Sequence, residues 1–386
     1  MINLANTPYS STSALLNSTL DTLGHYGFED IQSGLDKPKV KDKLHKTREL
    51  AYVLPHERKL AGLTKTYLEG RANKWNTPKL LYNIDKPRAG SKSSSFGLHV
   101  VGAEGAVAEI TILSTVATLL KKFSMQDFVV HINSIGDRES KIRFVRELNN
   151  YMRDISSELP STVLQDFKRK ESLLALSRLL EQGHTLAYTA PDPVEYLSDD
   201  SRARLREVLE YMEHMNINYE LDKTLLGSVD CWDNTIFEFR IPKEDAYVPV
   251  ARGGRYSTLA RRVYGKKLSS VGVIIDHDLS GRTAFGQVKN INPKFFISWL
   301  GDEARASAFS VMENFHDSGI PLAKLISSSC IAEQMKYSEK LDVPYIIIIG
   351  YKESMDNTAI VRNTATRVQK AVPMSQLVSY VSRLKV

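Results

Sequence analysis

The sequence contains little cysteine and no long hydrophobic run, and these two absences narrow the class of protein. Only two cysteines, Cys231 and Cys330, occur in 386 residues, and they lie far apart. This spacing supports neither a disulfide framework nor a zinc site, so we expect both to be small buried apolar residues. No apolar run approaches the roughly 18–20 residues of a membrane span, and the N-terminus lacks a secretion signal pattern. We therefore expect a cytoplasmic protein without a bound metal.

The charge of the chain is concentrated in two stretches. Residues 37–92 contain fifteen Lys and Arg but five Asp and Glu, and residues 252–267 contain six basic residues and no acidic one. A solvated surface is one explanation, and a polyanion such as RNA is the other. The candidate RNA-binding residues are Arg88, Lys92, Arg252, Arg255, Arg261, Arg262, Lys266 and Lys267.

Hydrophobic periodicity predicts mixed helices and strands before residue 285. Helices are expected over 10–24 and 110–123, and strands at 79–82 and 128–133. Residues 141–180 and 201–215 are predicted to be helical, with charges that alternate in sign as on solvated helices. Strands are then predicted from Ile236 onward and at Val271–Ile275. Between them, Gly253 and Gly254 allow either a sharp turn or a close backbone approach to a ligand.

After residue 292 the pattern changes to a regular alternation of strands and helices. Strands are predicted at 295–300, 321–325 and 345–349, with helices at 302–318 and 329–341 between them. Short strands around Ile360 and Val368 and a helix over 375–384 complete the pattern. This alternation predicts a separate, parallel-rich α/β domain over 292–386. Its charge is only about +2, from eleven basic and nine acidic residues, so RNA binding there is not electrostatically obvious.

Two segments together resemble the histidine-binding motif and the third class II motif of histidyl-tRNA synthetase. The first is Leu225–Phe239, with Phe237-Glu238, and the second begins with Gly253-Gly254-Arg255-Tyr256. The resemblance implies an α/β fold with an α+β core, in which a class II antiparallel sheet of six or seven strands is flanked by helices. This core would occupy 1–285, with a helical insertion at about 141–215. Residues 292–386 resemble the anticodon-binding domain of the family.

The same resemblance shows where the chain departs from the family at chemically important positions. Asn83 replaces the arginine that grips the ATP α-phosphate, and Leu279 replaces the arginine that holds the other ATP phosphates. Gly227 stands in place of the arginine that contacts the activated carboxylate. The remaining substrate-side positions are occupied by Gly97, Val101, Cys231 and Trp232. The resemblance therefore implies a degenerate active site with no catalytic residue.

Three functional classes are compatible with this sequence. The first is a regulatory subunit, like the synthetase paralogue that controls the catalytic subunit of ATP phosphoribosyltransferase in histidine biosynthesis. The second is an RNA-binding or translation-associated protein, with tRNA or another RNA as partner. No cofactor is expected for either class. The third is a divergent but active histidine–tRNA ligase, which would require ATP and Mg²⁺. Residues 10–31 resemble the dimer-forming motif of the family, so a homodimer is expected.

Overall fold

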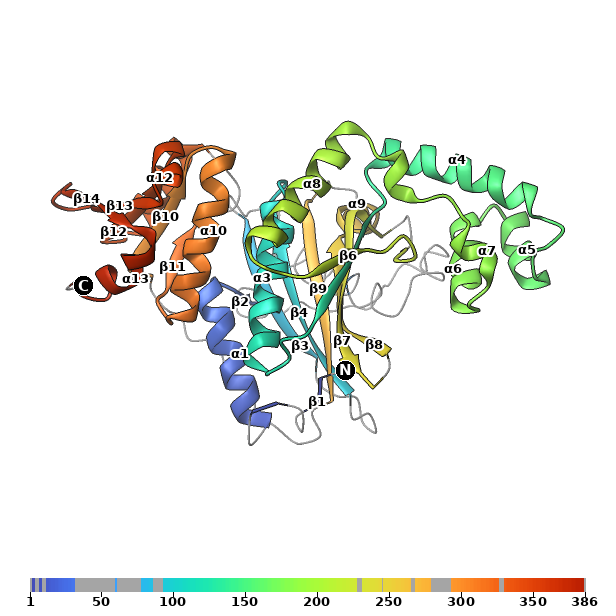
Figure 1. Cartoon of the computed structure of the whole chain (residues 1–386), viewed down its shortest axis with the longest axis horizontal. Helices are drawn as coiled ribbons and strands as arrows, with labels where there is room; N and C mark the ends of the chain where they lie inside the picture. Colours follow the sequence, from blue (N-terminus) through green and yellow to red (C-terminus); the bar gives the residue numbers. More distant parts are fainter. Residues whose placement is uncertain are drawn as a thin grey trace.

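The strands of this computed structural model are divided between two sheets (Figure 1). The structure describes residues 2–3, 7–8, 12–31, 60, 78–85, 93–227, 231–244, 246–264, 268–278, 293–325 and 330–384. Within these residues the larger sheet contains β1 (Ile2–Asn3), β2 (Glu29–Asp30), β3 (Lys79–Asp85), β4 (Ser93–Val101), β5 (Val129–Ser134), β6 (Tyr219–Leu221), β7 (Asp233–Lys243), β8 (Ala246–Arg255) and β9 (Ser270–Asp278). The order across this sheet is β2-β3-β4-β9-β8-β7-β5-β6, and β1 pairs with β9.

Antiparallel pairing dominates the larger sheet. The six strands from β3 through β4, β9, β8 and β7 to β5 are each antiparallel to the next. The two edge strands β2 and β6 add parallel pairs. The predicted antiparallel class II core is therefore confirmed, and the parallel strands extend it at both edges. The predicted glycine pair lies inside β8, where a Cβ at Gly253 would come within 2.3 Å of the Gly272 carbonyl oxygen. Close strand approach, not a turn, thus requires this glycine.

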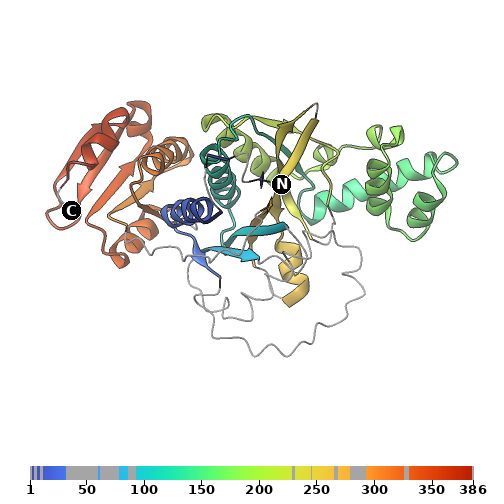
Figure 2. The same ribbon diagram turned by 90° about the horizontal axis from the view of Figure 1, so that it is seen from below.

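Three helices cover one face of the larger sheet. They are α1 (Thr12–Tyr26), α3 (Val107–Lys122) and α8 (Asp199–His214), and α3 contacts both of the others (Figures 1 and 2). Alternate residues of the strands, such as Leu98, Val100, Phe237 and Phe239, enter the main hydrophobic core beneath these helices. Almost all of α3 is buried, because it lies between the sheet and α1. The predicted helices at 10–24 and 110–123 are confirmed with small shifts at their ends.

The insertion between β5 and β6 is helical, as predicted, and has its own core. It contains α4 (Arg138–Asp154), α5 (Ser161–Lys168), α6 (Ser172–Glu181), α7 (Thr185–Tyr188), the 3-10 helix η4 (Pro193–Tyr196) and then α8. The first four helices lie at the end of the molecule opposite the C-terminal domain (Figures 1 and 2). Phe144, Leu148 and Met152 of α4 pack with residues of α5, α6 and α7, apart from the main core. Only α8 returns to that main core, through residues such as Val208 and Met212.

The C-terminal part forms the second sheet, whose strand order is β11-β10-β12-β13-β14. Its elements are β10 (Phe295–Trp299), α10 (Asp302–Asp317), β11 (Leu322–Lys324), α11 (Ile331–Lys340), β12 (Tyr345–Ile349), α12 (Tyr351–Met355), β13 (Thr358–Asn363), β14 (Gln369–Pro373) and α13 (Met374–Val381). The first three strands of this order are parallel, but β13 and β14 pair antiparallel. The expected parallel-rich sheet is thus mixed, because the connection from β13 to β14 is too short for a crossover.

The C-terminal domain packs against α1 and α8. The rings of Tyr211 and Phe309 lie 5.0 Å apart, and those of Tyr26 and His316 lie 4.2 Å apart. Arg305 of α10 also forms an ion pair with Glu207 of α8. As a result, the described side chains of α1 are mostly covered within the chain. The homodimer expected from residues 10–31 stays a prediction.

Two further expectations concern the cysteines and the surface. Both cysteines are free; Cys231 is buried as predicted, but Cys330 is exposed, because it immediately precedes α11 at the surface. The prediction for Cys330 was therefore wrong.

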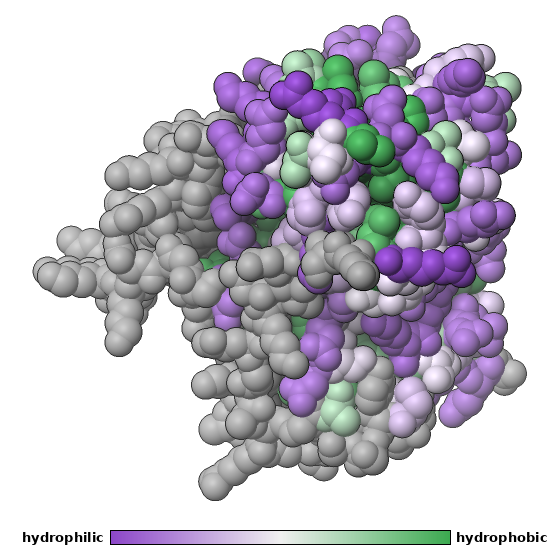
Figure 3. Space-filling view, turned by 90° about the vertical axis from the view of Figure 1, so that its left-hand side faces the viewer, coloured by the Kyte–Doolittle hydropathy of each residue, from purple (hydrophilic) through white to green (hydrophobic). Residues whose placement is uncertain are grey.

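On the C-terminal side of the molecule, hydrophilic residues cover most of the described surface, with hydrophobic ones between them (Figure 3). None of the described helices combines the length and hydrophobicity that crossing a bilayer requires.

Candidate functional site

The candidate site lies on the face of the larger sheet that α1, α3 and α8 leave uncovered. Residues directly opposite one another on neighbouring strands point to the same face. One such row across β3, β4, β9, β8, β7 and β5 consists of Asn83, Gly97, Ile274, Arg252, Glu238 and His131. We call this surface the site face, because it brings together the predicted positions Asn83 and Gly97 with the histidine-motif strand β7.

A buried apolar cluster occupies the middle of the site face. We call it the site-face cluster, and its members are Leu60, Ile135, Leu225, Cys231, Trp232, Ile236, Tyr256, Leu259 and Ile274. Trp232 and Cys231, two of the predicted degenerate positions, are fully buried within it. Most of these side chains come from β7, β9, α9 (Ser257–Tyr264) and the residues just before β7 and α9, while Ile135 follows β5 and Leu60 lies far from them in the sequence. The structure therefore fills the centre of this face with the protein's own side chains.

Gly227 and Trp232 fit each other within this cluster. A Cβ at position 227 would lie 2.2 Å from Cδ1 of the Trp232 indole, and one at Gly254 would lie 2.9 Å from its Cε3. Contacts under 3.0 Å between such atoms are not tolerated, so the indole takes the space that a side chain at position 227 needs. An arginine at position 227 and the observed indole therefore exclude each other.

Gly97 and Asn83 form a second filled region with His99 and Tyr256. A Cβ at position 97 would lie 2.4 Å from Oδ1 of Asn83 and 2.8 Å from Nε2 of His99. The His99 ring lies 2.9 Å from the Tyr256 hydroxyl through Nδ1 and 3.3 Å from Asn83 Oδ1 through Nε2. A neutral imidazole matches these partners, since Nδ1 can accept from the tyrosine while Nε2–H donates to the amide. Val101, another of the predicted degenerate positions, lies two residues after His99 in β4 and is also fully buried.

Burial lowers the pKa of His99 to about 3. Because the pKa in the folded state lies below the ordinary value of about 6.5, the unfolded chain binds the proton more readily. The stability that depends on neutral His99 is therefore fully present above about pH 6.5 and is lost as the pH falls toward 3.

We expect a His99→Gln variant to lose less stability in acid than the parent. When the pH falls from about 7 to about 4.5, protonation of His99 in the unfolded chain should lower the free energy of unfolding of the parent by roughly 2–3 kcal/mol. The variant lacks this histidine and should not show this decrease. Urea unfolding followed by circular dichroism at both pH values measures this difference. Burial also lowers the pKa of His316 to about 3, with smaller effects of nearby positive charge, but that residue is unchanged in both proteins. Parallel pH profiles would contradict the expectation.

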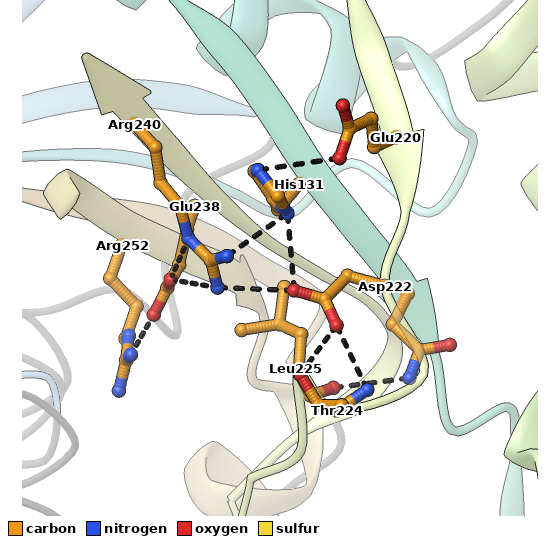
Figure 4. A network of polar contacts seen from close by, with 9 residues as sticks. His131, Glu220, Asp222, Thr224, Leu225, Glu238, Arg240 and Arg252 are labelled. Carbon is orange, nitrogen blue, oxygen red and sulfur yellow. Dashed lines mark hydrogen bonds and ion pairs between the residues drawn. The ribbon is translucent and has the colours of Figure 1, made fainter. Parts of the chain in front are cut away.

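A network of charged side chains borders the site-face cluster on β5, β7 and β8 (Figure 4). Glu238, only 1% exposed, pairs with Arg252 and lies 2.8 Å from Nη2 of Arg240. The same guanidinium is 3.1 Å from Asp222, whose other neighbour is Nδ1 of His131 at 3.1 Å. Burial alone would raise the pKa of Asp222, but hydrogen bonds from Thr224 and the charge of Arg240 lower it overall. Each positive charge here therefore faces a carboxylate within the chain.

This network changes the interpretation of Arg252, a predicted RNA contact. Its side chain is 35% exposed, and Glu238 is its ion-pair partner across the strands. A polyanion would have to compete with this carboxylate. The network was missed in the sequence because its members come from three strands and the loop after β6, and only the register brings His131, Glu238 and Arg252 into one row. The sequence signal that was available is that each predicted strand carries an ionisable residue among apolar ones, namely His131 in β5 and Glu238 in β7.

Arg255, another predicted RNA contact, is not at the surface. Its guanidinium is 4% exposed and forms two hydrogen bonds with fully buried Glu109 of α3, at 2.7 and 2.6 Å. It also donates to the carbonyl oxygens of Ala103 and Gly105 and to the Ser269 hydroxyl. A guanidinium whose donors are all engaged inside the protein cannot bind a polyanion. The prediction for Arg255 is corrected: it links β8 to the start of α3.

The other predicted residues have different positions. Arg261 on α9 is exposed and lines a polar cavity of about 530 Å³. The charged lining of this cavity is mixed, with basic Arg138, Lys141, Arg204, Arg255 and Arg261 and acidic Glu104, Asp137, Asp200 and Asp233. Arg88, Lys92, Lys266, Lys267 and Leu279 lie outside the described residues, as does the side chain of Arg262. No described group of three histidine, cysteine or carboxylate side chains is placed to hold a metal ion.

Comparisons with known proteins agree with the motifs and the fold. The anticodon binding domain family matches residues 294–384. The histidine–tRNA ligase of Acetivibrio thermocellus is 27% identical over 331 residues, which cover 83% of this chain and 79% of the ligase. That of Rippkaea orientalis is 25% identical over 339 residues, which cover 84% and 78%. The apo histidyl-tRNA synthetase of S. aureus has the same fold, with a TM-score of 0.51 and 20% identity over 95% of this chain and 94% of the synthetase. The chain is therefore similar to histidine–tRNA ligases over most of its length, and its C-terminal part matches the anticodon binding domain.

Proposed function

We propose that this chain is a non-catalytic member of the histidyl-tRNA synthetase family and acts by binding a macromolecule. The observation that carries the proposal is the fit between Gly227 and Trp232. The resemblance places at position 227 an arginine that contacts the activated carboxylate, and the indole of Trp232 occupies that space. The substrate-side residue is thus absent, and a neighbouring side chain takes the volume that it would need.

Asn83 supports the same proposal from the ATP side. The resemblance places an arginine here to grip the α-phosphate, but Asn83 is neutral, 6% exposed and hydrogen-bonded to His99. Loss of one donor that stabilises developing charge commonly costs about 10²–10³ in rate. Since the sequence lacks both phosphate-binding arginines and the substrate-side arginine, adenylate formation should be abolished.

We expect no histidine-dependent ATP–pyrophosphate exchange and no charging of tRNA. The measurement is exchange of labelled pyrophosphate into ATP with and without histidine, with an active histidine–tRNA ligase as the positive control. Exchange above the no-histidine blank would overturn the proposal. It would support the alternative of a divergent, ATP- and Mg²⁺-dependent ligase, the activity named for the curated relatives.

Two binding roles are compatible with a non-catalytic core. One is regulatory, like the family paralogue that controls ATP phosphoribosyltransferase. The other is RNA-associated, and it is supported by the two basic stretches of the sequence, in which Arg261 is exposed on α9. Both roles are compatible with the proposed homodimer, which light scattering would report as about twice the 43.4 kDa chain mass.

For the RNA-associated role, we expect neutralisation of Arg261, Arg262, Lys266 and Lys267 together to weaken RNA binding. Because each phosphate contact releases counterions, the slope of log K against log salt should flatten by up to a few units. Fluorescence anisotropy with a labelled RNA at several salt concentrations measures both effects. A matched control neutralises Arg143, Lys168, Arg169 and Arg206, which are exposed and lie outside both basic stretches and outside the C-terminal domain. An unchanged affinity and slope in the first variant, or no RNA binding by the parent at low salt, would leave a solvated surface as the explanation.

A further inference from the structure

An open groove runs along one face of α4 in the helical insertion, at the right-hand end of the molecule in Figure 1. It has a volume of about 720 Å³ and is lined by α4 and by the end of α5. The lining positions of α4, from Arg138 to Arg153, recur at intervals of three or four residues and so form one stripe of the helix. Phe144, Leu148 and Met152 form another stripe, which packs into the core of the insertion.

The centre of the groove is apolar. Ile142 and Val145 of α4 and Phe167 at the end of α5 line it. The side chain of Ile142 is 61% exposed, so it is accessible to a partner. Apolar side chains at this helical spacing are the contacts that receive an amphipathic helix in helix-in-groove recognition.

The rim of the groove is basic. Arg138, Lys141, Arg146, Arg153 and Lys170 line it, and no acidic residue does. Lys141 and Arg146 are paired with Asp233 and Glu147. Among the residues that the structure describes, Arg138, Arg153 and Lys170 form no ion pair. The groove therefore combines an apolar floor with positive charge that lacks a counter-charge.

We propose that this groove binds an acidic amphipathic helix of a partner protein. The stripe from Arg138 to Arg153 spans about 24 Å, the length of roughly four helical turns. A partner helix of that length would place apolar residues at i, i+3, i+4 and i+7 against Ile142 and Val145, with its carboxylates toward the basic rim. The floor favours a protein over a nucleic acid, because a sugar–phosphate backbone gains little from aliphatic side chains. The proposal does not depend on whether the site face is catalytic.

The test uses the full chain and two fluorescent 16-residue peptides made only of leucine and glutamate. One has leucines at i, i+3, i+4 and i+7, and the other has the same composition with the leucines spread around the helix. We expect the patterned peptide to bind at least about tenfold more tightly than the scrambled one in fluorescence anisotropy. Ile142→Asp should weaken its binding by about tenfold or more, because the floor loses its most exposed apolar contact.

Charge variants provide the second measurement. The combined substitutions Arg138→Glu, Arg153→Glu and Lys170→Glu should remove binding of the patterned peptide. The matched control combines Arg143→Glu, Arg169→Glu and Arg206→Glu, which changes the net charge by the same amount at exposed positions that do not line the groove. Circular dichroism should show unchanged folding, since all of these side chains are at the surface.

Three outcomes would overturn the proposal. Equal affinity for both peptides would show that the groove does not select an apolar face. If Ile142→Asp left the affinity for the patterned peptide unchanged, the apolar floor of the groove would not be the binding surface. Absence of peptide binding, together with RNA binding that is lost in the triple charge variant, would make the groove a nucleic-acid surface instead. The pyrophosphate exchange assay is independent of all three, so failure of this proposal and failure of the non-catalytic assignment are distinguishable.

Discussion

Replacing Arg255 by methionine is expected to lower the free energy of unfolding of the synthetase-like core by about 3–5 kcal/mol. The substitution leaves the Glu109 carboxylate fully buried without its partner, and it removes the donors to the carbonyl oxygens of Ala103 and Gly105. An uncompensated buried charge is costly because it has lost its hydration, and the nearby charge of Arg204 does not replace the two hydrogen bonds from Arg255. The midpoint of urea unfolding, followed by far-UV circular dichroism, measures the loss.

The control for this prediction is Arg261→Met, which makes the same chemical change at an exposed position of α9. It should alter stability by no more than about 0.5 kcal/mol. Combining Arg255→Met with Glu109→Leu should restore part of the loss, because it removes the unpaired charge together with its partner. If Arg255→Met were as mild as Arg261→Met, the buried ion pair would not hold β8 to α3 as described.

The two arginines also show what the sequence could and could not predict. Arg252 and Arg255 lie three residues apart in one basic stretch, so composition alone gave both the same surface role. Their environments differ because β8 alternates its side chains between faces and because Glu109 is 146 positions away in the sequence. The partner of a buried charge depends on strand register, which local patterns do not determine.

Local periodicity was sufficient for most of the secondary structure. The strand β12 and the helix α10 were predicted nearly to the residue, because β12 is a short continuous apolar run that ends at Gly350 and α10 repeats its apolar residues with a helical period after Gly301. The short helix α12 was missed, since five residues are too few for a periodic signal. The direction of β13 and β14 was also missed, because it depends on connection length and not on residue pattern.

Motifs in the sequence were sufficient to locate the candidate site. They could not predict that side chains of the protein itself occupy it. The resemblance identified Gly227, Cys231 and Trp232 as departures from the family one at a time. Only the fold shows that the small residue at 227 and the large one at 232 are complementary, through the contact of the missing Cβ with the indole. Tyr256 was named as part of a motif but without this role, and His99 was not singled out, because a lone histidine in a strand carries no local signal; together they complete the filled surface around Asn83.

We expect Gly227→Ala and Trp232→Ala to be strongly coupled in a double-mutant cycle. Gly227→Ala alone places a Cβ 2.2 Å from the indole and should cost about 1–3 kcal/mol through overpacking. Trp232→Ala alone removes a fully buried indole and should cost about 3–5 kcal/mol. In the Trp232→Ala background the space beside position 227 is empty, so Gly227→Ala should become nearly neutral. Urea unfolding of the parent and the three variants gives the coupling energy, expected at about 1–3 kcal/mol.

The matched control for this cycle is Gly105→Ala, at a glycine whose missing Cβ would come no closer than 4.0 Å to another residue. It should add to Trp232→Ala within about 0.3–0.5 kcal/mol, as distant sites do. If Gly227→Ala were neutral in the parent, the indole would be able to move away, and the site face could then open to admit a larger residue or a ligand. If instead the coupling is observed, restoring arginine at position 227 requires a change at Trp232 as well. The residues at positions 227 and 232 would then depend on each other. Changing either one alone could not restore the arrangement that the resemblance implies for the family.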